Sequence, residues 1–114
     1  MHAEYELLAE FFKALAHPAR LQILDMLRGG ELCVCHIETA LLKRQAYVSQ
    51  QLMELREAGL VTSRKEGLQV YYSLGDPRVA DVLDRVCGAA QPRSAFLEGC
   101  PCPSCAVIAI SHIS

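Results

Sequence analysis

The six cysteines of this chain are grouped in a way that suits the capture of a soft ion. They form a C-x-C pair, a C-x-C-x-x-C cluster and one isolated residue, which are Cys33 and Cys35, then Cys100, Cys102 and Cys105, and finally Cys87. Thiolates are the protein ligands that select soft metals and metalloids, and paired thiols also form reversible disulfides. The grouping therefore favours a metal or redox site over cysteines scattered through a core.

The sequence carries no feature that directs the chain to a membrane or out of the cytoplasm. Residues Met1 to Tyr5 include an acidic group and lack the apolar core of a signal peptide. No stretch approaches the roughly 20 apolar residues of a membrane span. Although six cysteines in a small secreted chain would suggest a disulfide framework, we expect a cytoplasmic protein with reduced thiols.

Length and composition predict one compact core. The chain has 114 residues, of which 52% are hydrophobic, and this is enough for a single domain. Its 11 Lys and Arg residues stand against 13 Asp and Glu residues, which excludes a generally basic protein that coats nucleic acid without specificity. Any DNA contact must therefore come from a local surface, which dimerisation would double.

Four helices are predicted in the first half of the chain, where apolar residues recur at three- and four-residue spacing. They cover Glu4–Leu15, Pro18 to the Gly29-Gly30 stop, Val34–Leu42 and Gln45–Ala58. Pro18 suits the first position of its helix because that position needs no N–H donor, and Gly59 suits the C-cap of the fourth helix.

After Gly59 the apolar period changes to two, which predicts a β-hairpin with its turn at Gly67. Asp76-Pro77 then offers a cap and a first turn for a final helix. The apolar face of that helix holds Val79, Val82, Leu83 and Val86. From Gln91 onward prolines and cysteines interrupt the pattern, so we expect a domain over residues 1–90 and a cysteine-rich tail over residues 91–114.

The third and fourth helices followed by a hairpin are the parts of a winged helix-turn-helix, in which the second of the paired helices enters the major groove of DNA. We therefore expect a mainly α fold with a small β-hairpin. If Val48, Leu52 and Leu55 face the core, polar residues of the same helix face outward. The candidate DNA-binding residues are Arg44, Gln45, Ala46, Ser49, Gln50, Arg64 and Lys65.

These residue types suit the two kinds of DNA contact. A glutamine such as Gln45 or Gln50 can bond adenine through both amide atoms, and Ser49 suits a phosphate or a base. The arginine at the helix entrance and the basic pair on the hairpin suit phosphates or the minor groove. No enzyme is expected, because the C-x-x-C of Cys102 and Cys105 lies in the proline-broken tail without a helix N-terminus to lower a thiol pKa.

Several runs together resemble the ArsR/SmtB family of metal-responsive repressors, and most closely its arsenic-responsive members. The runs are Glu31-Leu-Cys-Val-Cys35, Val48-Ser-Gln-Gln-Leu52, Leu55-Arg-Glu-Ala-Gly-Leu-Val61, Arg64-Lys-Glu-Gly67 and Val70-Tyr-Tyr72. The resemblance implies a homodimer, held by the first and last helices, that represses its own operon and leaves its operator, an inverted repeat, on binding inducer. The chain departs from the family at the turn position often filled by glycine, which is Leu42, and at the histidine of the recognition helix, which is Gln50 or Gln51.

Cys33 and Cys35 need an unwound helix start if they are to bind one ion, because residues two apart in a helix point about 200° away from each other. Arsenic-responsive members place a third cysteine one turn on, and this chain has Glu38 there. We therefore expect As(III), or Sb(III), to take its third thiolate from the tail cysteines of the same or the partner subunit. The alternative is a separate three-thiolate site within the tail.

Two other classes of inducer remain open. The thiols can serve a sensor of cadmium, lead or zinc, or a redox- or persulfide-responsive repressor on the same fold. The isolated Cys87 is interpreted as a core or interface residue because it falls near the apolar face of the last helix.

Overall fold

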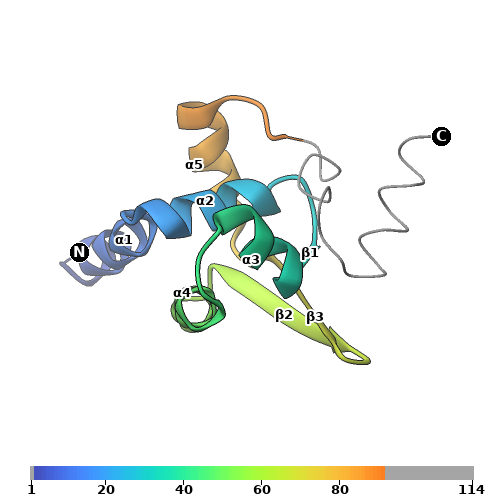
Figure 1. Ribbon diagram of the computed structural model, residues 1–114. Helices are drawn as coiled ribbons and strands as arrows, with labels where there is room; N and C mark the ends of the chain where they lie inside the picture. The colour runs from blue at the N-terminus through green and yellow to red at the C-terminus, as the bar shows by residue number, and fades with distance from the viewer. Residues whose placement is uncertain (1, 92–114) are drawn as a thin grey trace.

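The computed structural model describes residues 2–91, with side chains from residue 4 onward. In this part of the chain, five helices surround one end of a three-stranded sheet (Figure 1). The elements are α1 (His2–Leu15), α2 (Pro18–Leu27), β1 (Leu32–Cys33), α3 (Val34–Leu41), α4 (Gln45–Glu57), β2 (Val61–Glu66), β3 (Gln69–Leu74) and α5 (Pro77–Cys87). None of the helices within residues 2–91 has the length and apolarity that a membrane span requires.

The core lies where α2, α3 and α4 pack together beside the sheet. Ile23 of α2 and Ile37 of α3 are fully buried, as are the three apolar residues of α4 that the sequence assigns to the core, Val48, Leu52 and Leu55. The predicted orientation of α4 is therefore confirmed, and its opposite face is left for solvent. All five predicted helices are present, with ends within two residues of the predicted ones.

The sheet has the order β1-β3-β2 with antiparallel pairing throughout. The hairpin of β2 and β3 is confirmed, and it projects from the helices as a wing (Figure 1). Gly67 turns the hairpin with a φ of 61°, a conformation that costs glycine little. Strand β1 was not predicted, because two residues are too few to show a period of two.

The apolar faces of α1 and α5 are only partly covered within residues 2–91 of the single chain. Phe11 of α1 and Leu83 of α5 are buried, whereas Leu7 of α1 is 72% exposed and Val86 of α5 is 71% exposed. Cys87 is also exposed, so it is not a core residue. Within residues 2–91, these outer residues are left largely uncovered, and α1 extends away from the other helices (Figure 1).

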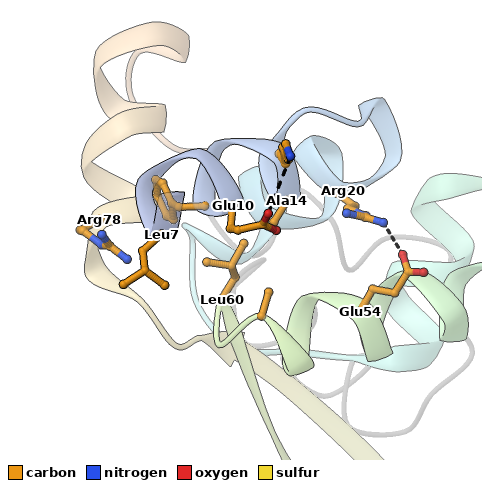
Figure 2. Close-up of a pocket in the computed structure, with 10 residues that line it drawn as sticks. Leu7, Glu10, Ala14, Arg20, Glu54, Leu60 and Arg78 are labelled. Atoms are coloured by element: carbon orange, nitrogen blue, oxygen red, sulfur yellow. Dashed lines mark hydrogen bonds and ion pairs between the residues drawn. The ribbon is translucent and has the colours of Figure 1, made fainter. Parts of the chain in front are cut away.

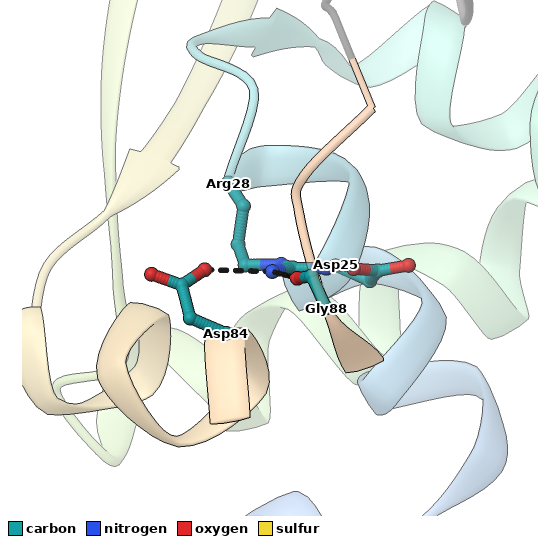
Figure 3. A network of polar contacts seen from close by, with 4 residues as sticks. All are labelled: Asp25, Arg28, Asp84 and Gly88. Atoms are coloured by element: carbon teal, nitrogen blue, oxygen red, sulfur yellow. Dashed lines mark hydrogen bonds and ion pairs between the residues drawn. The ribbon is translucent and has the colours of Figure 1, made fainter. Parts of the chain in front are cut away.

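Arg28 fastens the end of α2 to the end of α5. Its side chain is 3% exposed, and its Nη1 donates to the Asp84 carboxylate and to the Gly88 carbonyl oxygen, each at 2.7 Å (Figure 3). Its Nε donates to Asp25 at 2.9 Å. A covered guanidinium with three acceptors fixes the two helix ends together. The segment that connects α2 to the cysteine pair therefore begins at a residue whose side chain is held in place.

Candidate DNA-binding face and thiol pair

The outward face of α4 is polar and open to solvent. The sequence-predicted residues of this helix, Gln45, Ala46, Ser49 and Gln50, are all exposed. Arg44 is the N-cap in an extended conformation and makes no side-chain capping bond, so the N–H groups of the first turn have no side-chain cap. A helix N-terminus of this kind favours phosphate oxygens. The face thus combines exposed polar side chains with an uncapped helix N-terminus.

The turn between α3 and α4 passes through Leu42, which has a φ of 56°. The backbone N–H of Leu42 donates to the carbonyl oxygen of Glu38 at 3.1 Å and closes α3. A leucine in this left-handed region costs about 1–2 kcal/mol. The left-handed conformation is one that glycine adopts at little cost, which agrees with the glycine expected at this position from the family resemblance.

A polar cluster holds α4 against α2. Arg20 of α2 donates from Nε to Oε1 of Gln51 at 2.8 Å and pairs with the Glu54 carboxylate (Figure 2). Glu54 also accepts a bond of 3.2 Å from Nε2 of Gln50. Gln51 is therefore the inward glutamine, and Gln50 is the one that faces solvent. Figure 2 shows Arg20 reaching from α2 to the side of α4 beside a groove lined by α1.

The wing arginine is engaged by two carboxylates. Arg64 donates from Nε and Nη2 to the two carboxylate oxygens of Glu31 at 2.8 and 2.7 Å, and from Nη1 to Glu66 at 2.6 Å. These hydrogen bonds, first to Glu31 and then to Glu66, raise the pKa of Arg64 above its ordinary value. The guanidinium also lies 4.6 Å from the centre of the Tyr71 ring. Lys65 is exposed. Phosphate binding by Arg64 and Lys65 stays a prediction.

The two cysteines of the C-x-C pair meet at the start of α3. Cys33 is extended, with φ −76° and ψ 156°, and is the N-cap, while Cys35 belongs to the first turn. Their Cα atoms lie 5.5 Å apart and their sulfur atoms are joined in a disulfide. The expectation of an unwound helix start is met, because Cys33 lies outside the helix in an extended conformation. Since Cys33 is extended and only Cys35 is helical, the divergence of two residues within one helix does not separate the sulfurs.

The surroundings of the pair are closed. Cys33 is 1% exposed and belongs to the core cluster, and Cys35 is partly buried against it. One turn further on, burial raises the pKa of the Glu38 carboxyl. Its Oε1 is buried without a hydrogen-bond partner within residues 2–91. In the same range, no three His, Cys, Asp or Glu side chains converge as a metal site would require.

The predicted tail ligands Cys100, Cys102 and Cys105 lie outside the described residues. Sequence reasoning missed three contacts near the site. They are the pairing of β1 with β3, the bonds from Arg20 to α4 and the ion pair of Arg64 with Glu31. Each joins residues that are far apart in the chain, so no periodicity or spacing could indicate them.

The paired helices, the buried side of α4 and the projecting hairpin define a winged-helix DNA-binding protein. Comparison with known proteins gives the family. A family described as "Bacterial regulatory protein, arsR family" matches residues 17–63. The chain belongs to the arsR family of transcriptional repressors and is not an enzyme.

Individual relatives agree with this assignment. An HTH-type transcriptional regulator of Methanocaldococcus jannaschii is 43% identical over 84 residues, which are 73% of this chain and 94% of the relative. A probable mercury resistance operon repressor of Streptomyces lividans is 38% identical over 96 residues, which cover 81% of this chain and 74% of that protein. The structure of HlyU from Vibrio cholerae superimposes with a TM-score of 0.71 at 37% identity, covering 75% of this chain and 97% of HlyU.

Proposed function

We propose that the protein is a cytoplasmic repressor that binds an inverted-repeat operator as a homodimer and leaves it when cysteine thiolates capture As(III) or Sb(III). The observation that carries the proposal is the meeting of Cys33 and Cys35 at the start of α3. Helix α3 leads through one short turn into the recognition helix α4. A change of geometry at the pair therefore acts on the element that positions the DNA-reading residues.

DNA is read by the exposed face of α4. Gln45 and Gln50 bond base edges in the major groove, and Ser49 binds a base or a phosphate, while Ala46 allows close approach. Arg44 at the helix entrance and the wing residues Arg64 and Lys65 bind the backbone. Exposure of all these residues in the single chain supports this assignment. Two copies related by a two-fold axis read two half-sites, which explains the inverted repeat.

The homodimer forms through α1 and α5. These helices leave apolar side chains uncovered in the single chain, and such a patch on a small protein marks an interaction surface. A two-fold dimer would bury each of them against a second copy. The residues are Tyr5, Leu7, Leu8, Phe12 and Val86, with Cys87 beside them.

The inducer is held by the reduced pair and one further thiolate. Two sulfurs that approach each other closely in the folded chain need little rearrangement to share one ion. Glu38 occupies the position of a third local ligand, and its partly buried carboxyl is a hard ligand that a soft ion uses poorly. The third thiolate therefore comes from Cys100, Cys102 or Cys105. The mercury repressor of Streptomyces lividans is a related protein whose name also points to a thiophilic ion.

A second candidate function follows from the disulfide itself. Oxidation of the two thiols by a peroxide or a polysulfide transfers two electrons to the oxidant, releases two protons and forms the S–S bond that joins Cys33 to Cys35. On this alternative the oxidised pair, and not an ion, changes the start of α3. HlyU from Vibrio cholerae, which is 37% identical to this chain, has a solved structure described as the reduced form. That description supports a redox alternative for the present protein.

The two functions are separated by challenging the DNA complex. The reduced protein is bound to a fluorescent duplex carrying the promoter of its own gene, and arsenite, antimonite, cadmium, lead, zinc or a polysulfide is added while anisotropy is followed. Release by arsenite or antimonite in excess reductant supports the proposal. Release by the polysulfide alone, reversed by reductant, supports the redox alternative. Release by zinc or cadmium in preference to arsenite overturns the assignment of the inducer.

A further inference from the structure

Glu31 connects the thiol pair to the wing. It lies two positions before Cys33, and its carboxylate accepts two hydrogen bonds, of 2.7 and 2.8 Å, from Arg64 on β2. The hydroxyl of Ser73 on β3 lies 3.4 Å from the same carboxylate. One short segment therefore carries both the sensor thiols and the carboxylate that engages a predicted DNA contact.

The sheet extends this connection. In its register Cys33 lies opposite Tyr71, and Tyr71 lies opposite Arg64 on its other side. The Arg64 guanidinium lies over the Tyr71 ring at 4.6 Å from its centre. Cys33, Tyr71 and Arg64 thus lie side by side in one row across the three strands. A displacement of β1 moves the anchor of Glu31 relative to the hairpin that holds Arg64.

The ion pairs with Glu31 and Glu66 occupy N–H donors of Arg64 that a phosphate would also use. Each of the three guanidinium nitrogens of Arg64 already donates to a carboxylate oxygen, two of them to Glu31 and one to Glu66. An arginine binds phosphate through the same planar fork of donors. Arg64 is half exposed, so a phosphate can reach it. Glu31 and a DNA phosphate are therefore alternative partners of one side chain.

We propose that Glu31 competes with DNA phosphate for Arg64 and that the state of the Cys33–Cys35 pair decides which partner prevails. Without inducer, the β1 segment lets a DNA phosphate share Arg64 with Glu31. When inducer binds the thiol pair, Glu31 again holds Arg64 in the ion pair, and the wing loses a positively charged contact with DNA phosphate. Glu31 is a positioning residue on this account. The proposal rests on the proposed inducer function of the thiol pair.

The test uses Glu31→Gln in the full chain, with Glu66→Gln as the matched control. Both substitutions remove a carboxylate from Arg64, but Glu66 lies on the wing and has no chain connection to the thiols. Each variant should bind the promoter duplex about two- to fivefold more tightly. Each should also steepen the slope of log K against log salt by up to about one, the value for one full phosphate contact, because the phosphate then meets less competition for Arg64. Only Glu31→Gln should reduce the ratio of Kd with arsenite to Kd without it.

A third variant decides whether Arg64 is the shared partner. In an Arg64→Ala background, the gain from Glu31→Gln should disappear, both in affinity and in salt slope. An unchanged arsenite ratio in Glu31→Gln, an equal change in Glu66→Gln, or a gain that survives without Arg64 would each overturn the proposal. Failure of the proposed inducer function has a different signature, because arsenite would then fail to release the unsubstituted protein. The salt slopes, measured without arsenite, would still report the competition for Arg64.

Discussion

Arg20 on α2 and Gln51 on α4 are joined by a hydrogen bond of 2.8 Å from Nε to Oε1. Gln51 is 7% exposed, and a buried amide needs such a partner. The same guanidinium pairs with Glu54 one turn further along α4. Two contacts on one side chain fix both the rotation and the position of the recognition helix relative to the core.

Replacing Arg20 by Ala should therefore destabilise the fold by about 1.5–3 kcal/mol, the range for hydrogen bonds to charged groups, because Gln51 would lose its partner. Urea unfolding followed by circular dichroism measures the change. Arg56→Ala is the matched control, since Arg56 is an exposed arginine of α4 whose contact is a bond of 3.3 Å to Ser63. It should cost less than about 0.5 kcal/mol. Equal losses in the two variants would show that the clamp contributes nothing.

Replacing Gln50 by Ala should weaken binding to the specific operator by about 1–3 kcal/mol and leave binding to a random duplex unchanged. Gln50 is the exposed glutamine of the recognition helix, and its partner Glu54 holds it at 3.2 Å without burying it. Anisotropy titrations with the promoter duplex and a shuffled duplex of equal length give both numbers. If the specific complex is as tight as that of the unsubstituted protein, Gln50 does not read a base.

The sequence predicts the helices well because each has a continuous apolar period, and proline, glycine or Asp76 marks an end of α2, α4 and α5. It also predicts the outward face of α4, since Val48, Leu52 and Leu55 determine which side is inward. It does not predict that Leu7 and Val86 remain exposed, because a period shows that a face is apolar and not what covers it. The partners of Arg64 depend on register between strands, which local patterns do not specify.

The start of α5 should respond to acid. Asp76 is the N-cap, its carboxylate accepts a bond of 2.9 Å from the backbone N–H of Arg78, and the Arg78 side chain lowers the pKa of this carboxyl below its ordinary value of 3.8. A group whose pKa is lowered by folding stabilises the fold above its unfolded pKa, and this contribution is lost as pH falls through the folded pKa. Stability contributed by Asp76 should thus be complete near pH 7 and decline only below about pH 4.

Asp76→Ala should remove that contribution, with a cost of about 1 kcal/mol at pH 7 for the lost cap. Urea unfolding of both proteins at pH 7 and at progressively lower pH measures it. The difference between them should shrink as the pH falls below 4, because the protonated carboxyl of the unsubstituted protein no longer accepts the charge-assisted bond. A difference that stays constant across this range would contradict the role of the ionised cap.

Serine at Cys33 or at Cys35 should abolish the response to inducer and leave DNA binding nearly intact, because the thiols precede the recognition helix and do not lie on its DNA face. The two positions differ in their surroundings. Cys33 is 1% exposed, so a serine hydroxyl there adds a burial cost of about 1–3 kcal/mol, and Cys33→Ala avoids it. DNA affinity and arsenite release are measured on each variant. Loss of DNA binding in Cys35→Ser and Cys33→Ala without inducer would make the pair structural.

Truncation after Arg93 should sharply reduce the affinity for As(III) while DNA binding persists, because the tail is the proposed source of the third thiolate. The local position one turn beyond Cys35 holds Glu38, whose carboxyl is partly buried and has its pKa raised by that burial. A carboxyl held toward its neutral form is a poor ligand for a soft ion. If the tail instead forms a separate site, the truncated protein is still induced through Cys33 and Cys35, and the full-length chain binds more than one ion. X-ray absorption and arsenic stoichiometry on both proteins decide, since three sulfur neighbours that survive truncation exclude the tail.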